Sequence, residues 1–262
     1  MGNLMNHPAG NFCWIELGTS DQSAAKEFYG QLFGWQAKDI PMGEGMGDYT
    51  MLLLDGKEVG ALYQLSAERQ PGVPSHWMPY VAVESADETA AKVEALGGTA
   101  LMPPFDVFTH GRMFVLKDPT GATISVWQAK EHSGIELVGV PGTICWCELA
   151  TPDAQRAGAF FSNLFGWSLK AGGGEMNYTE LVNGTQPIGG IMPMAGDMWQ
   201  GVPPHWMAYF MVADCDATAR KAWELGGKLC VEPQDIPNVG RFSVITDPQG
   251  AVFSIIQLGG KG

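Results

Sequence analysis

The chain has 262 residues, of which 45% are hydrophobic and 16% charged, a composition typical of folded proteins that excludes wholesale disorder. Its formal net charge of −13 argues against nucleic acid or an anionic membrane as a partner. Five cysteines without a CxxC pair predict free thiols in a reducing compartment. With no secretory signal at the start and no long apolar run, we expect a cytoplasmic protein with no membrane partner.

A strand and a helix are the first predicted elements. Residues 13–17 (CWIEL) read as a strand. The helix is expected to begin near Thr19, with Gln22 completing a capping box, and to end at Gly34. Its apolar side chains recur at helical spacing and predict the buried face: Ala25, Phe28, Tyr29 and Leu32.

A second unit follows a Pro- and Gly-rich break at residues 71–74. It opens with a strand over Trp77–Val83, continues with a helix over residues 86–96, and ends in two strands. The sequence DPTG at residues 118–121 predicts the turn between those strands. The first half of the chain therefore contains a strand–helix–strands module twice.

The same order of elements returns in the second half of the chain. Residues 11–35 match residues 143–167 at an offset of 132, and from Tyr49/Tyr178 onward the offset is 129. The repeated helix is predicted to start with Pro152 and to bury Ala157, Phe160, Phe161 and Leu164. This duplication predicts two domains, residues 8–130 and 140–259.

Several strings together carry a family resemblance. They are FYGQLFGW at 28–35, ALGG at 95–98, the PxHW and DPxGA strings, and the tandem copy of the pattern. The chain resembles the vicinal oxygen chelate (VOC) superfamily of glyoxalases, bleomycin-resistance proteins and extradiol dioxygenases, and most of all its two-domain glyoxalase-like or hydroxylase-like subgroup. The resemblance implies an α+β fold in which four βαβββ modules pair into two half-open barrels, each around a small-molecule site.

The resemblance also implies where a metal would be held. Aligned on the strand starts and the DPxG turns, the metal-ligand positions of the family fall near Phe12, Ala61, Met78, Ser125, Ile144, Gly190, Met207 and Ser254. None of these is a usual ligand of a hard divalent cation, so we expect no metal or other cofactor. The remaining alternative is a relocated site that uses Glu16 with His76, or Glu148 with His205.

Strand alternation predicts what lines the cavities instead. Glu16 and Glu148 are the candidate catalytic residues, because an inward carboxylate needs a partner or a ligand. The candidate ligand-binding residues are Trp14, His76, Met78, Tyr80, Arg112, Trp127, Trp146, His205, Met207, Tyr209 and Arg241.

Each candidate also has a structural interpretation. Trp14 and Trp146 fill the barrels in that view, and Arg112 and Arg241 form ion pairs with the two glutamates. The two histidines contact the backbone, and Tyr49 and Tyr178 are packing residues.

Four functions remain open from the sequence. The first is a protein that binds a small metabolite or drug-like molecule, flat or cationic, in an aromatic-lined cavity. The second is a metal-free lyase, isomerase or hydroxylase-like enzyme with a cavity glutamate as general base. A metal-dependent glyoxalase-type enzyme and a scaffold with filled cavities are the others. The chain is expected to be a monomer or a homodimer.

Overall fold

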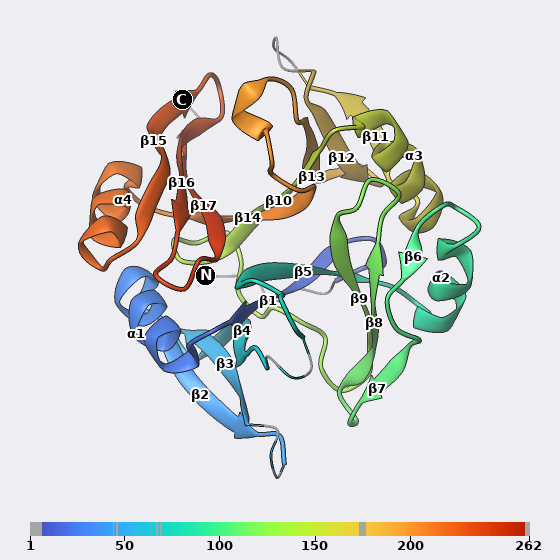
Figure 1. Ribbon diagram of the computed structural model, residues 1–262, viewed down its shortest axis with the longest axis horizontal. Coiled ribbons are helices and arrows are strands. Elements are labelled where there is room, and N and C mark those ends of the chain that lie inside the picture. Colours follow the sequence, from blue (N-terminus) through green and yellow to red (C-terminus); the bar gives the residue numbers. More distant parts are fainter. Residues whose placement is uncertain are drawn as a thin grey trace.

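Two curled sheets dominate the computed structural model of the protein (Figure 1). The structure describes residues 7–43, 45, 47–66, 68, 70–172 and 177–259; the start of the chain, where no secretory signal is predicted, lies outside them. Within these residues there are four α-helices and two sheets, of nine and eight strands. No helix among them is long and apolar enough to cross a membrane.

The first sheet uses residues of the first repeat only. Its strands run in the order β2-β3-β4-β1-β5-β9-β8-β6, and β7 also pairs with β8. They are β1 (Phe12–Thr19), β2 (Gln36–Pro41), β3 (Asp48–Leu54), β4 (Lys57–Gln64), β5 (His76–Ala82), β6 (Thr99–Ala100), β7 (Phe105–Val107), β8 (Gly111–Lys117) and β9 (Thr123–Ala129). Its helices are α1 (Gln22–Phe33) and α2 (Ala86–Val93).

The second sheet repeats this order with residues of the second copy: β11-β12-β13-β10-β14-β17-β16-β15. Its strands are β10 (Ile144–Thr151), β11 (Ser168–Ala171), β12 (Thr179–Asn183), β13 (Gln186–Pro193), β14 (His205–Met211), β15 (Lys228–Ile236), β16 (Gly240–Thr246) and β17 (Val252–Leu258). Its helices are α3 (Ala154–Phe165) and α4 (Cys215–Glu224), with a short 3₁₀ turn at Asp197–Trp199.

One antiparallel strand pair joins the two modules of each sheet. In the first sheet β1 pairs with β4 of its own module in parallel and with β5 of the next module antiparallel. The second sheet does the same with β10, β13 and β14. The predicted α+β architecture of paired βαβββ modules is therefore confirmed.

The buried faces of α1 and α3 are as predicted, but the starts of these two helices are not. α1 buries Ala25, Phe28, Tyr29 and Leu32, and Gly34 ends it with a φ of 78°. Its N-cap is Asp21 rather than Thr19, because the Asp21 carboxylate accepts a hydrogen bond from the Ala24 amide. In α3, Asp153 takes the same role, so Pro152 precedes the cap instead of opening the helix. α2 ends at Val93, three residues earlier than expected.

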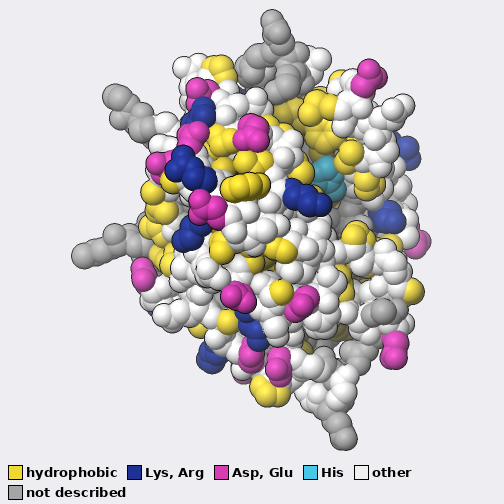
Figure 2. Space-filling model, turned by 60° about the vertical axis from the view of Figure 1, so that its left-hand side comes forward, with side chains coloured by type: hydrophobic (Ala, Val, Ile, Leu, Met, Phe, Trp, Pro, Cys, Tyr) yellow, Lys and Arg dark blue, Asp and Glu magenta, His cyan; other side chains and the backbone are white. Residues whose placement is uncertain are grey.

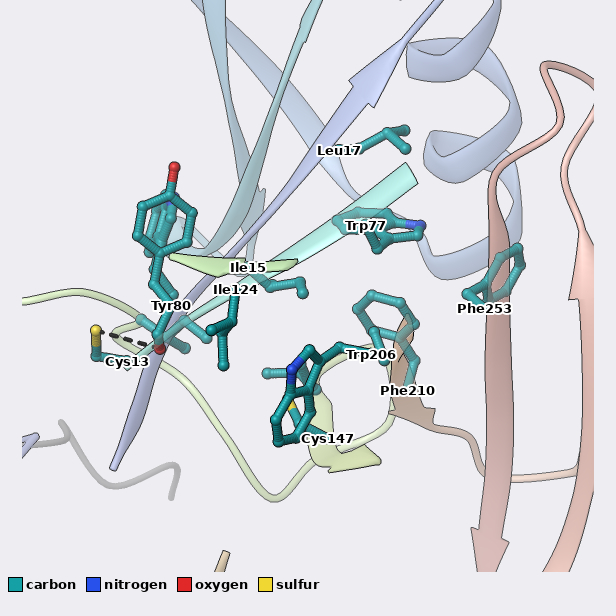
Figure 3. Close-up of a cluster of buried hydrophobic side chains, with 14 of the residues drawn as sticks. Cys13, Ile15, Leu17, Trp77, Tyr80, Ile124, Cys147, Trp206, Phe210 and Phe253 are labelled. Carbon is teal, nitrogen blue, oxygen red and sulfur yellow. Dashed lines mark hydrogen bonds between the residues drawn. The ribbon is translucent and has the colours of Figure 1, made fainter. Parts of the chain in front are cut away.

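The two domains pack through the faces of β5 and β14 opposite to those that carry Met78 and Met207. Trp77 of β5 lies 5.1 Å from Phe210 of β14, measured between ring centroids, and Phe253 of β17 packs on Phe210 at 6.0 Å (Figure 3). Ile15 and Leu17 of β1 are fully buried in the same core. Since side chains alternate along a strand, the residues between them face the opposite, concave side.

A bulge at the start of β1 changes one predicted orientation. The pairing register with β5 shifts between Phe12 and Trp14. Phe12 therefore packs against Trp167 and Trp206 at 5.6 and 5.5 Å, although uninterrupted alternation had predicted that it shares the cavity face of Trp14 and Glu16. β10 shows the same shift between Ile144 and Trp146.

Candidate functional site

A carboxylate held by two phenols lies on the concave face of the first sheet. The Tyr80 hydroxyl of β5 donates to Glu16 Oε1 of β1 at 2.5 Å, and the Tyr49 hydroxyl of β3 donates to Oε2 at 2.8 Å. Trp14 Nε1 donates to the Tyr49 oxygen at 3.0 Å. The three strands thus fix both carboxylate oxygens through a continuous hydrogen-bonded chain.

Burial sets the acid–base behaviour of this cluster. Desolvation raises the pKa of Glu16, and the hydrogen bonds from Tyr80 and Tyr49 oppose this shift only in part. Burial and the adjacent carboxylate also raise the pKa of both phenols well above the usual tyrosine range. Glu16 therefore gains its proton at a higher pH than an exposed glutamate does, while the tyrosines remain hydrogen-bond donors.

A cavity of about 510 Å³ opens over Glu16. Its remaining lining comes from the concave face, from the loops at its mouth and from the start of β14: Tyr63, Gln70, Val73, Pro74, His76, Trp77, Met78, Tyr80, Leu101, Met102, Phe105, Met113, Val115, Thr123, Ser125, Pro204, His205 and Trp206. Glu16 is the one carboxylate among these residues, and no lysine or arginine is among them. The described lining is thus apolar apart from one acidic group and a few neutral polar side chains.

The two histidines of the PxHW strings contact the backbone, in agreement with their structural interpretation. His76 Nδ1 lies 2.8 Å from the Pro74 carbonyl oxygen, and His205 Nδ1 lies 2.9 Å from that of Pro203. Because a carbonyl only accepts, each Nδ1 carries the proton and Nε2 remains available. Both rings also line the cavity over Glu16, so the second domain contributes His205 to the site of the first.

The second domain repeats the polar cluster. Tyr209 of β14 donates to Glu148 Oε1 of β10 at 2.9 Å, and Trp146 Nε1 donates to the Tyr178 hydroxyl at 2.8 Å. Burial raises the pKa of Glu148, and the hydrogen bonds from Tyr209 and Tyr178 act against it. Met207 lies across the strand pair from Glu148, as Met78 does from Glu16.

The two arginines lie elsewhere. Arg112 forms ion pairs with Asp87 at 2.7 Å and Asp106 at 3.4 Å, and Arg241 pairs with Asp216 and Asp235 at 2.6 and 3.1 Å. The expected ion pairs with Glu16 and Glu148 are therefore wrong. Arg112 precedes the cavity residue Met113, and strand alternation turns its side chain to the opposite face.

Trp14 and Trp127 of the first barrel are positioning residues rather than lining residues. Trp127 Nε1 donates to the His132 carbonyl oxygen at 3.0 Å, and the His132 ring packs edge-on against Trp14 at 4.8 Å. Neither Trp127 nor Trp14 is among the residues that line the cavity. Trp14 instead orients Tyr49, and through it Glu16.

Tyr49 and Tyr178 are the residues that sequence reasoning missed. We interpreted them as packing residues, but Tyr49 holds Glu16 directly and Tyr178 receives the Trp146 hydrogen bond. One signal could have found them, since both repeats keep a tyrosine where the offset changes from 132 to 129. The sequence could not show that Tyr49 contacts Glu16, because β3 lies two strands away from β1 in the sheet.

Comparison with known proteins identifies the family. The model of the Glyoxalase/Bleomycin resistance protein/Dioxygenase superfamily matches residues 11–126 and 143–255, so the chain belongs to this superfamily. CFP32 of Mycobacterium tuberculosis, which carries the provisional name of a glyoxylase, is 44% identical over 249 residues, 93% of each chain. The anthracycline biosynthesis protein DnrV of Streptomyces peucetius is 38% identical over 262 residues, covering 94% of this chain and 92% of DnrV.

Solved structures share the fold at low sequence identity. The Mn(II)-bound glyoxalase of Novosphingobium aromaticivorans superposes with a TM-score of 0.66 at 20% identity, over 95% of this chain and 82% of its own. The 2,3-dioxygenase LapB of Pseudomonas sp. KL28 gives a TM-score of 0.65 at 13% identity, over 97% and 94%. At these identities the likeness concerns the fold alone.

The donors around Glu16 do not fit a divalent metal. In the part of the chain that the structure describes, no three His, Cys, Asp or Glu side chains gather where they could hold a metal ion. The strand neighbours of Glu16 are Met78 and Ala61, and its oxygens accept from two phenols. A thioether, a methyl group and protonated phenols do not replace the oxygen and imidazole ligands that Mn²⁺ or Zn²⁺ prefers.

Proposed function

We propose that the protein binds a small metabolite or drug-like molecule in the cavity over Glu16 without a metal ion or other cofactor. The observation that carries this proposal is the cavity of about 510 Å³, in which Tyr80 and Tyr49 hold the Glu16 carboxylate by hydrogen bonds. Its volume suits a drug-sized ligand, and its few polar groups suit orientation of that ligand. The name of DnrV, an anthracycline biosynthesis protein, supports a ligand of anthracycline size.

Thermal-shift screening with aromatic and cationic compounds tests this proposal. A ligand should stabilise the folded protein by about 1.4 kcal/mol for each tenfold excess over its Kd. Met78→Trp places an indole in the cavity beside Glu16 and should abolish the shift. Met207→Trp is the matched change in the second domain and should leave the shift intact.

Either of two results would overturn this assignment. One is a thermal shift that persists in Met78→Trp, and the other is its loss in Met207→Trp alone, which would move the site to the second domain. Metal analysis adds an independent readout, because stoichiometric zinc, nickel, iron or manganese in the purified protein would contradict the absence of a metal.

The second candidate is a metal-free lyase, isomerase or hydroxylase-like enzyme. The specific observation in its favour is the raised pKa of Glu16, which makes this carboxylate a better proton acceptor than an exposed one. Glu16 would be the general base, and the Tyr80 hydroxyl would orient the substrate. Glu148 and Tyr209 would have the same roles in the second domain.

Turnover measurements separate this candidate from binding alone. Glu16→Gln should reduce kcat by about 10²–10⁴-fold, as expected for loss of a general base. The wild-type rate should rise with pH through the elevated pKa of Glu16, because the base acts only when ionised. Full activity in the Glu16→Gln/Glu148→Gln double variant would eliminate both carboxylates as bases.

A further inference from the structure

The two sheets differ at the edge strand beside the cavity mouth. In the second sheet β15 is a single strand from Lys228 to Ile236 that pairs with β16 with two register shifts. In the first sheet the corresponding stretch is split into β6 and β7, and residues 101–104 (LMPP) lie between them. Pro103 lacks the amide hydrogen that a strand donates to its neighbour, and the second domain has Glu232 at this position, which favours the break in the first sheet only.

This break places three apolar side chains at the mouth of the cavity over Glu16. Leu101, Met102 and Phe105 all line the cavity and are 48%, 42% and 42% exposed. We call these three residues the apolar lip. Their counterparts in the second domain, at an offset of 129, are Cys230, Val231 and Gln234. The lip therefore belongs to the first domain only.

An apolar path leads from the lip to the carboxylate. Phe105 pairs with Met113 across the strands β7 and β8. Met113 Sδ lies 4.0 Å from the Tyr80 hydroxyl, and Tyr80 donates to Glu16. Methionine and aromatic side chains suit flat, polarizable rings. One molecule in the cavity could thus cover the lip and reach Glu16.

Charge defines which end of such a molecule faces inward. Among the described residues that line the cavity, Glu16 is the one carboxylate and none is a lysine or arginine, and Arg112 is held by Asp87 and Asp106 on the other face. An anionic ligand would therefore meet repulsion from Glu16 that none of these described lining residues compensates with a positive charge. The net charge of −13 adds long-range attraction for cations.

We propose that the cavity over Glu16 selects flat aromatic cations, with the positive group at the Glu16 carboxylate and the rings against the apolar lip. This inference rests on the proposed binding function and adds the chemical class of the ligand. The rings of Tyr63 and Tyr80 beside the carboxylate contribute cation–π attraction. Ligand binding replaces water on Leu101, Met102 and Phe105, which gives the lip its share of the affinity.

Three probes with one ring system test the charge preference. They are 9-aminoacridine, which is cationic, acridine, which is neutral at mildly alkaline pH, and acridine-9-carboxylate, which is anionic. Fluorescence titration should give the cation a Kd about tenfold lower than that of the neutral probe, a difference of ~1.4 kcal/mol. The anion should bind most weakly. In Glu16→Gln the cation should lose this advantage while the neutral probe binds as before.

Variants of the lip test the second half of the proposal. Leu101→Ser and Phe105→Ser change exposed side chains and should weaken the cation and the neutral probe alike, by about tenfold each. Cys230→Ser and Gln234→Ala are the matched changes in the second domain and should have no effect on either Kd. A far-ultraviolet circular dichroism spectrum of each variant confirms that the fold is retained.

The outcomes separate this inference from the proposed function. Equal affinities for the three probes, or lip variants without effect, would overturn the inference. If binding is still abolished by Met78→Trp in that case, the binding function itself stands. Failure of every probe while other compounds give a shift sensitive to Met78→Trp would likewise reject the aromatic cation alone. Absence of any such ligand would reject both.

Discussion

The two domains share a hydrogen-bonded Glu–Tyr pair on the concave face of each sheet, which we call the polar floor, but the residues around this pair differ. Glu16 with Tyr80 and Glu148 with Tyr209 occupy equivalent strands and bond in the same way. In the first domain Met113 lies beside Tyr80, whereas the second domain has Phe242 at that position, 6.5 Å from the Tyr209 ring. The comparison indicates that duplication preserved the floor, while substitutions at the barrel edge made the two sites unequal.

A second difference lies where the domains meet. The Tyr29 hydroxyl accepts from Trp77 Nε1 at 3.0 Å and donates to Asp247 Oδ2 of the other domain at 2.9 Å. The counterpart of Tyr29 is Phe161, whose ring lies 5.4 Å from Trp206, much as Tyr29 lies 5.3 Å from Trp77.

Without that hydroxyl, Trp206 Nε1 and Asp118 Oδ2 are buried and lack a hydrogen-bond partner among the described residues. The Tyr29 hydroxyl thus forms a hydrogen-bonded bridge between Trp77 and Asp247, and the equivalent interface at Phe161 lacks such a bridge. Hydrogen bonds inside a protein are worth most when their loss leaves a buried group unpaired, so the two interfaces should respond in opposite ways to gain and loss of a hydroxyl.

Tyr29→Phe should have the largest effect, because it removes the bridge from the interface that has it. Trp77 Nε1 and a buried oxygen of Asp247 would both lose their partner, at an expected cost of about 2 kcal/mol. Urea unfolding measures this loss as a lower midpoint with an unchanged slope. A midpoint within error of the wild type would mean that the hydroxyl does not stabilise the interface.

Phe161→Tyr should have a smaller effect of opposite sign. The added hydroxyl would lie between Trp206 Nε1 and Asp118 Oδ2 and give each a partner, for a gain of about 1 kcal/mol. For a chain of this size, thermal unfolding followed by circular dichroism should show a midpoint that is about 2–4 °C higher than that of the wild type. The double variant Tyr29→Phe/Phe161→Tyr moves the bridging hydroxyl from one interface to the other. A lower thermal unfolding midpoint in Phe161→Tyr alone would show that the space beside Trp206 cannot hold the added oxygen.

The smallest expected effect is a change in the pH dependence of stability, which arises from the buried carboxylates. Burial raises the pKa of Glu16, Glu148 and Asp247 in the folded state above their unfolded values. Their stabilising contribution is present below the unfolded pKa and is lost as the pH rises through the folded pKa. Glu16→Gln removes the pH-dependent contribution of Glu16 to stability. The free energy of unfolding of this variant, relative to that of the wild type, should therefore increase with pH.

Urea unfolding over a series of pH values measures this difference. Glu224→Gln, a change of an exposed carboxylate on α4, is the control and should follow the wild type in parallel. We define the difference as the free energy of unfolding of Glu16→Gln minus that of the wild type. A fall of this difference with rising pH would contradict the raised pKa of Glu16. The same measurement on Glu148→Gln compares the two floors directly.

Local sequence rules predicted the concave face only where strands run without interruption. Alternation correctly brought Glu16, Met78 and Tyr80 to one side, but the bulge at the start of β1 turned Phe12 to the other. Helical spacing predicted the buried face of α1, whereas its cap was misplaced by two residues, because Asp21 competes better than Thr19 for the free amides.

The sequence by itself determined the duplication, the order of strands and helices, and the carboxylate on each first strand, because these depend on repetition and on neighbours along the chain. Only the tertiary structure decided the partners. Tyr49 reaches Glu16 from a strand two places away, His205 enters a cavity of the other domain, and Arg112 faces Asp87 instead of Glu16. These contacts depend on sheet order, curvature and domain packing, which no local pattern encodes.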